Sequence, residues 1–260
     1  EGEIEQEKRI LAQEISSHRD EQQRNLSAQE LAYMLLFLEE PDELGSRGNV
    51  ENIQSFDREM VSEYYERFFV PQNMVVSLAG SFHFEEVVRQ IEGSMGKMPA
   101  GQPVPRVISA DVSDRRARAV YRQTERQPVV DLELSYHAYG LAEAKFGAMI
   151  AVSQILGGGL SSRLFTRVRE EKGLVYQIQS QPVVYSDAGS LDVALRVDNA
   201  NLPDACEATR EVLEEFRQNG VTRQELESYK ENVRCGMDIM CDRPDKLADY
   251  LGRQDLLLPA

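Results

Sequence analysis

Apolar residues recur at helical intervals from residue 1 to about residue 40. They lie on both sides of a polar break at 25–27, at Ile4, Leu11 and Ile15, and then at Leu31, Met34, Leu35 and Leu38. Steps of three, four and seven residues are typical of amphipathic helices. We therefore expect one helix before the break and another after it, followed by a loop from Pro41 to Gly48, which is rich in turn formers.

The next part of the first half predicts a helix, a strand and a second helix. Ser55 offers a helix start, and the helix is expected to run to about Phe68. The apolar run Met74 to Gly80 predicts a short strand closed by a glycine, and the spacing from Phe84 to Met95 predicts an amphipathic helix.

The second half predicts three strands and four helices. Strands are expected at 129–139, 175–185 and 190–197, and helices at 142–156, 162–171, about 202–219 and 223–240. A hairpin turn at 187–189 would join the last two strands. This order favours the α+β class, in which helices cover one face of a mostly antiparallel sheet.

A change of composition divides the two halves. Pro99, Gly101, Pro103 and Pro105 are followed by charged residues, which predicts a linker over 99–118. We expect residues 1–98 to be the later part of a first domain, and residues 119–260 to be a related second domain that is incomplete at its end. The chain starts with Glu1 inside a helical pattern, so we expect it to be cut from a longer protein.

Charge and cysteine content exclude some classes of function. A net charge of -15 argues against a nucleic-acid-binding surface. It favours an ordinary soluble acidic protein, with attraction of basic peptides as the alternative. No apolar run approaches the roughly 18 residues of a membrane span, and the compartment stays open, cytoplasmic or periplasmic in a bacterium. Cys206, Cys235 and Cys241 lack the spacing of a cysteine zinc site, so buried reduced thiols are expected.

Two glutamates recur with the apolar residues of the first helix. Ile4, Glu7, Leu11, Glu14 and His18 follow one another in steps of three and four, which predicts one stripe of the helix. A lone carboxylate on an apolar face costs several kcal/mol unless it is paired or binds a metal. Pairing with Arg9 or Arg19 on a merely charged helix is the alternative to metal binding.

Both glutamates can hardly bind the same ion. Seven helical residues rise roughly 10.5 Å, whereas a zinc–oxygen bond is about 2.0–2.2 Å. One carboxylate could therefore be a ligand, and the other would orient a partner such as a ligating histidine.

The segment from Gly157 to Tyr176 predicts a helix end, a glycine turn, a short helix, a second glycine stop and a strand. Arg169 and Tyr176 lie on either side of the second stop. Taken alone, they are a surface arginine and a tyrosine at the edge of the core. The glycines at 157–159 lack the Gly-Lys-Ser/Thr ending of a phosphate-binding loop, so a helix stop is favoured.

This segment resembles the M16 family of inverted-motif zinc metallopeptidases, which includes pitrilysin, insulysin and the mitochondrial processing peptidase. The stretch from Tyr64 to Gly80, with its aromatic-x-Pro-x-Asn-Met turn, is similar to the same family. So is Glu7 to Glu14, which looks like the family's acid-Arg-x-x-x-x-x-Glu type of helix, with Lys8 at the arginine position. The resemblance covers most of the chain and implies a fold of the processing-peptidase type.

The resemblance implies roles for particular residues. Glu14 would be the third ligand of one zinc ion, Glu7 a supporting carboxylate, and Arg169 and Tyr176 would reach into a zinc site and hold the peptide or its oxyanion. The family's H-x-x-E-H helix supplies two histidine ligands and the general base. None of His18, His83 and His137 has that motif, so the remaining ligands are expected outside this chain, which would be inactive alone.

The resemblance therefore implies a fragment of a zinc-dependent metalloendopeptidase that hydrolyses peptides in a closed chamber with zinc-activated water. Peptide substrates and a homodimer or a paired homologous subunit are the expected partners. The alternative is a non-catalytic peptide-binding or structural subunit of the same family, such as the inactive partners of the processing peptidase.

Overall fold

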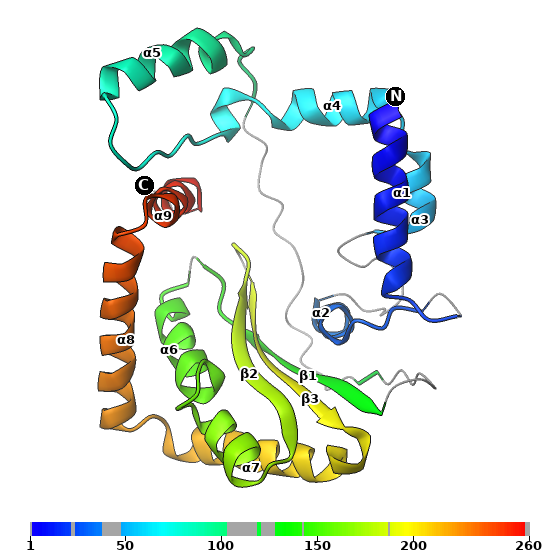
Figure 1. Ribbon diagram of the computed structural model, residues 1–260, viewed down its shortest axis with the longest axis vertical. Coiled ribbons are helices and arrows are strands. Elements are labelled where there is room, and N and C mark those ends of the chain that lie inside the picture. Colours follow the sequence, from blue (N-terminus) through cyan, green and yellow to red (C-terminus); the bar gives the residue numbers. More distant parts are fainter. Residues whose placement is uncertain are drawn as a thin grey trace. The chain divides into compact units, whose positions relative to one another are not determined.

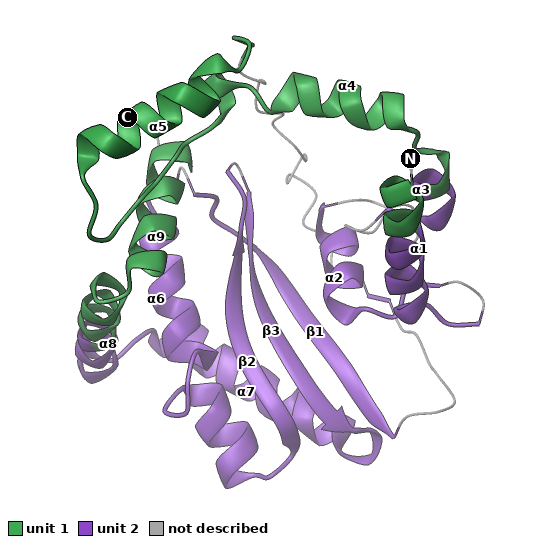
Figure 2. Ribbon diagram, turned by 45° about the horizontal axis from the view of Figure 1, so that its top comes forward, with its two compact units in different colours: residues 1–8, 54–108, 232–260 green, residues 9–53, 109–231 purple. Residues whose placement is uncertain are grey.

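The computed structural model describes residues 2–21, 24–37, 48–102, 119–120, 128–141, 143–186 and 188–257. The chain divides into two compact units, which are described separately (Figure 2). Unit 1 comprises Glu1–Lys8, Gln54–Ile108 and Asn232–Ala260, and unit 2 comprises Arg9–Ile53 and Ser109–Glu231. Helices α1 (Gly2–Ser17) and α8 (Arg223–Cys241) contain residues of both units.

Unit 2 is built on a three-stranded antiparallel sheet (Figure 1). Its strands are β1 (Val129–Ala138), β2 (Val175–Val184) and β3 (Gly189–Asp198). Their order is β1-β3-β2, and β3 pairs with β1 from Val129↔Asp198 to Ala138↔Gly189. Strand β3 is therefore the central strand of the described sheet, and β2 is an edge.

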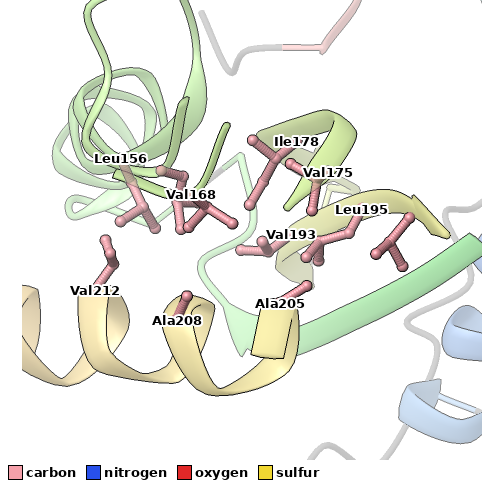
Figure 3. Close-up of a cluster of buried hydrophobic side chains, with 11 residues drawn as sticks. Leu156, Val168, Val175, Ile178, Val193, Leu195, Ala205, Ala208 and Val212 are labelled. Atoms are coloured by element: carbon pink, nitrogen blue, oxygen red, sulfur yellow. The ribbon is translucent and has the colours of Figure 1, made fainter. Parts of the chain in front are cut away.

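One face of this sheet carries the hydrophobic core. The helices α6 (Phe146–Gly157) and α7 (Leu202–Asn219) and the π-helix η3 (Phe165–Glu171) cover it. Alternate side chains of β3 point into the core, and Val193 and Val197 are fully buried. Figure 3 shows Val193 in one cluster with Ile178 of β2 and Val212 of α7.

The other face of the sheet is polar along much of its length. Helix α2 (Ala28–Phe37) packs against β1 on this side. Its Tyr33 ring lies 5.8 Å from the ring of Tyr185, and its Phe37 ring lies 5.7 Å from His137. These aromatic contacts hold α2 at the end of the face where β1 ends and β3 begins.

Unit 1 contains α4 (Arg58–Phe68), α5 (Phe84–Ser94) and α9 (Pro244–Leu257). The short elements η1 (Pro71–Asn73) and η2 (Met95–Lys97) also belong to unit 1. The short helix α3 (Val50–Ser55) contains residues of both units, and η4 (Asn199–Asn201) belongs to unit 2. Asp57 caps α4, because its Oδ1 accepts a hydrogen bond of 2.8 Å from the Met60 amide.

The structure confirms the α+β class and the antiparallel sheet with helices on one face. The predicted strand Met74–Gly80 is wrong: the segment includes extended backbone but pairs with no strand among the described residues, and a strand needs a partner. Two predicted helix starts also need correction: Asp57, rather than Ser55, caps α4, and α6 starts at Phe146, rather than at 142. Helices α3 and α9 were not predicted.

Other predictions fall outside what the structure describes. The loop Pro41–Gly48 lies almost wholly outside the described residues, as does most of the linker 99–118. The division into domains at that linker stays a prediction. All three cysteines are free, as expected, but the expectation of burial is wrong for Cys235 and Cys241, which are exposed.

Small residues allow α6 to approach β2 closely. The hydroxyls of Ser153 and Ser180 lie 3.3 Å apart in the interior. A Cβ atom added at Gly157 would lie 2.7 Å from the Ser180 Cβ. Real atoms do not approach so closely, so the helix end needs a glycine at this position.

We predict that Gly157→Ala lowers the free energy of unfolding by about 1–3 kcal/mol, because the added methyl group overpacks the contact between α6 and β2. Urea unfolding followed by circular dichroism measures the change. Gly159→Ala is the control, since a Cβ there meets nothing within 4 Å. Equal stability of the two variants would contradict this account of the contact.

Candidate functional site

A left-handed glycine ends η3 and turns the chain into β2. Gly173 has φ 64°, and its amide donates to the Arg169 carbonyl at 3.1 Å. The Leu174 amide donates to the Val168 carbonyl at 3.2 Å. Backbone hydrogen bonds of this kind close a helix around a glycine, so Arg169 lies in the last turn of η3 and the strand begins two residues after the glycine.

Tyr176 lies on a β-bulge at the edge of the described sheet. Val175 is paired with Val197 and Gln177 with Arg196, so Tyr176 has no partner in the ladder. A bulge re-aims the side chain of its extra residue. The Tyr176 side chain is 55% exposed, and its hydroxyl forms no hydrogen bond with any described residue.

Arg169 differs from the other cations of its helix. Arg167 forms an ion pair of 3.1 Å with Glu215, and Lys172 forms one of 3.0 Å with Glu211. The Arg169 guanidinium instead lies over the Phe165 ring, 4.7 Å from its centroid, and has no carboxylate partner among the described residues. Its N–H groups therefore remain available as donors.

The carboxylates of α1 are not on the buried side of the helix, which corrects the predicted apolar stripe. Glu7 and Glu14 are both exposed, and the more buried side runs from Ile4 through Lys8 and Ala12 to Ile15. That side is one residue further round the helix than the stripe expected from the sequence. Lys8 can lie there because its ammonium binds Glu5 at 2.7 Å and the Gln54 carbonyl at 3.3 Å.

The described residues do not assemble a metal site. Among them, no group of three or more His, Cys, Asp or Glu side chains could hold an ion. Arg169 and Tyr176 lie on either side of one helix–strand junction of unit 2. The roles predicted for Glu7, Glu14, Arg169 and Tyr176 stay predictions.

A polar cavity in unit 2 was not predicted. It has a volume of about 380 Å³ and lies on the polar face of the sheet, beside the end of α1 and the start of α2. Its lining comes from 17–18, 26–29, 131–133, Gln177, Gln179 and 194–196. The signal in the sequence was the alternation of polar side chains along β1, which places Asp131, Glu133, Ser135 and His137 on one face.

Glu133 is the most perturbed group in this cavity. Burial, and secondarily the nearby Asp192, raise its pKa from 4.5 to about 7. Burial also raises the pKa of Asp192, against the effect of hydrogen bonds from Ser135 and Ser190. Both carboxyl groups therefore resist ionisation more than exposed acids do.

Unit 2 thus combines an antiparallel sheet, with its core helices on one face, and an exposed arginine and tyrosine that flank the η3–β2 junction. A family model described as the peptidase M16 inactive domain matches residues 55–233. The chain therefore belongs to the M16 peptidase family.

Curated relatives carry two kinds of name. "Uncharacterized zinc protease YmxG" of Bacillus subtilis is 25% identical over 81% of this chain and 50% of its own length. "Uncharacterized zinc protease Mb2805c" of Mycobacterium bovis is 28% identical over 97% of the chain and 58% of its own length. "Non-peptidase homolog YmxG" of Helicobacter pylori is 22% identical over 75% of the chain and 45% of its own length. The chain thus spans about half the length of these relatives.

Solved structures share the fold. The peptidase M16 inactive domain from Pseudomonas fluorescens has a TM-score of 0.81 at 18% identity, over 99% of this chain and 61% of that one. A chain of complex III2 from Candida albicans has a TM-score of 0.74 at 14% identity, over 96% and 60%. None of the helices in the described ranges is both long and apolar enough to cross a membrane.

We predict that Glu133 makes the stability of the chain depend on pH. Its pKa is raised on folding, so its contribution to stability is fully present below pH 4.5 and is lost as the pH rises through about 7. Glu133→Gln cannot titrate. The unfolding free energy of this variant, relative to the unmodified chain, should therefore rise over that interval in urea titrations.

Asp131→Asn is the control, because Asp131 lies on the same face but is largely exposed. This control should keep the pH dependence due to Glu133. An unchanged pH profile in Glu133→Gln would contradict the raised pKa.

Proposed function

We propose that the chain is part of a zinc-dependent metalloendopeptidase and that unit 2 supplies the groups that position the peptide. In this proposal Glu14 is a zinc ligand, Glu7 orients a ligating imidazole, and the other ligands and the general base come from outside these 260 residues. Bound zinc would activate the water that attacks the peptide. Membership of the M16 family and the names of the relatives support this assignment.

The observation that carries the proposal is the bulged, exposed Tyr176 on the strand that follows Arg169, an arginine that has no ion pair with any described residue. A purely structural tyrosine at a sheet edge would be expected to pack its ring or bond its hydroxyl. A purely structural arginine would be expected to pair like Arg167. The two side chains instead present a hydroxyl and a guanidinium as donors from one rigid helix–strand junction.

Donors of this kind suit the reacting carbonyl of a peptide. As water adds, negative charge develops on the carbonyl oxygen, and donors that are already oriented stabilise it without further reorganisation. The Tyr176 hydroxyl would donate one hydrogen bond. The Arg169 guanidinium would add further N–H donors and a positive charge.

Glu14 has the donor chemistry for the ligand role, since a carboxylate oxygen is an ordinary zinc ligand. Its side chain is exposed and makes no contact with a described cation, so it is accessible to an ion held by groups outside this chain. Glu7 lies seven residues before it on the same helix and is suited to hold an imidazole through its N–H.

The second candidate is a non-catalytic subunit of the family that binds peptide or shapes the chamber. The name of the Helicobacter pylori relative favours it. Zinc content and peptide hydrolysis of the full-length protein separate the two candidates. Absence of both would favour the non-catalytic subunit.

We predict that Arg169→Ala and Tyr176→Phe each lower kcat/KM for peptide hydrolysis by the full-length protein by about 10²–10³-fold, the range for loss of one oxyanion donor. Zinc content should not change, because neither residue binds the ion. Arg167→Ala is the matched control on the same helix and should have little effect, since Arg167 is already paired with Glu215. Similar losses in all three variants would refute the positioning role.

We also predict that Glu14→Gln lowers the zinc content of the full-length protein, because an amide oxygen is a weaker ligand than a carboxylate. Elemental analysis after gel filtration measures this without an activity assay. Glu3→Gln, an exposed acid of the same helix, should retain the metal. Unchanged zinc in Glu14→Gln would remove Glu14 from the ligand set.

A further inference from the structure

Arg163 begins the helix whose last turn carries Arg169. Its guanidinium binds the Glu225 carboxylate of α8 in a bidentate manner, with Nε 2.6 Å from Oε1 and Nη2 2.8 Å from Oε2. The same Nη2 donates to the Gly220 carbonyl at 2.8 Å. The guanidinium also lies over the Phe216 ring of α7, 4.8 Å from its centroid. Arg163 therefore contacts α7, α8 and the turn between them at once.

Glu225 is itself held in place at the start of α8. The Thr222 amide and hydroxyl donate to its Oε2 at 2.7 and 2.8 Å, and the Glu225 amide donates to the Thr222 hydroxyl oxygen at 3.2 Å. This reciprocal arrangement is a capping box. The hydrogen bond from Arg163 lowers the pKa of Glu225 from 4.5 to about 2, so the carboxylate stays ionised near neutral pH. The residue that caps α8 thus also binds the helix that leads to Arg169.

This ion pair is better shielded from water than its neighbours. The Arg163 and Glu225 side chains are 17% and 27% exposed, whereas those of Arg167 and Glu215 are 41% and 46% exposed. Exposed ion pairs contribute little to structure. A bidentate arginine–carboxylate pair, by contrast, fixes the orientation of both groups, and the point charge of a lysine cannot reproduce it. We therefore expect Arg163, rather than Arg167, to fix the start of this helix.

The direction of the Arg169 side chain depends on how the helix starts. The first turn is α-helical, with the Thr166 amide 3.0 Å from the Ser162 carbonyl, and η3 then continues as a π-helix. π-Helices are rare and frequently lie at functional sites. Because α- and π-helices differ in the number of residues per turn, a change of helix type before Arg169 would turn its side chain elsewhere. A fixed first turn keeps that guanidinium in one direction.

We propose that Arg163 is a positioning residue: with Glu225 it fixes the start of the helix against the turn between α7 and α8, so that Arg169 points to the reacting peptide carbonyl. The inference rests on the proposed role of Arg169 and extends it to two residues that act through Arg169 rather than on the peptide. Displacement of a positioned group by about 1 Å can lower a reaction rate by about 100-fold.

The test uses peptide hydrolysis by the full-length protein. Arg163→Lys keeps the charge and Glu225→Gln keeps the size of the side chain, but neither retains the bidentate ion pair. Each variant should lower kcat by about 10–100-fold, with KM and zinc content unchanged, because the displaced donor acts on the transition state.

A double-mutant cycle separates positioning from a general structural role. In the Arg169→Ala background, Arg163→Lys should lower kcat by less than about threefold, since the residue through which Arg163 acts is then missing. A residue that merely stabilises the fold would cause the same loss in both backgrounds.

Two controls complete the cycle. Lys172→Ala removes an exposed ion pair from the end of the same helix and should leave kcat unchanged. Met34→Ala opens a cavity beneath α2, where Met34 is 1% exposed. It should lower the melting temperature and leave kcat unchanged at temperatures at which the variant is folded.

Three results would overturn the inference: an unchanged kcat in Arg163→Lys, an equal loss with and without Arg169, or an equal loss in Met34→Ala. If the unmodified full-length protein hydrolyses no peptide, the proposed function fails instead. Hydrogen exchange then tests the attachment of the helix, because the Gly173 and Leu174 amides that close η3 should exchange faster in Arg163→Lys than in Lys172→Ala. Equal exchange in these two variants would refute the attachment as well.

Discussion

Burial of one face of a small antiparallel sheet is the interaction on which unit 2 depends. Val193, Leu195 and Val197 of the central strand are almost fully buried beneath α6, η3 and α7. Each buried aliphatic side chain contributes roughly 1.5–3 kcal/mol relative to an exposed one. Because successive side chains of a strand point to opposite faces, the alternate residues of the same strands lie on the other face, where α2 packs at one end. The alternation of side chains along the strands thus places apolar residues in the core and polar residues in the cavity.

The same arrangement fixes the groups that we assign to peptide positioning. The end of η3 is tied to the sheet through Val168, which is fully buried, and through the hydrogen bonds that close the helix around Gly173. Arg169 is the next residue after Val168 and therefore points away from the core. A donor held on a packed helix–strand junction loses little conformational entropy when it meets its ligand, which a loop of the same sequence would not provide.

Sequence patterns predicted the strands of unit 2 and most of its helices because alternation and helical spacing were long and uninterrupted there. They failed at Met74–Gly80, whose composition favours a strand but whose backbone has no described partner. They also misjudged α1, since a stripe through Glu7 and Glu14 and one through Lys8 and Ala12 fit the same spacing, and only packing chooses between them. The Arg169–Tyr176 segment was recognised by resemblance, whereas Glu133 was missed because its neighbours Ala194 and Asp192 come from a strand about 60 residues away in the chain.

The irregularity at Tyr176 has a consequence for how this surface can change over time. Val175 and Ile178 both enter the core, although an odd separation of three residues would place them on opposite sides of a regular strand. The extra residue of the bulge, between Val175 and Gln177, brings both side chains to the same face of the strand. Deletion of Tyr176 would remove the bulge and leave the side chains of Val175 and Ile178 in the core. A lineage that lost this residue would keep the scaffold of unit 2 and lose the phenol to which we assign peptide positioning.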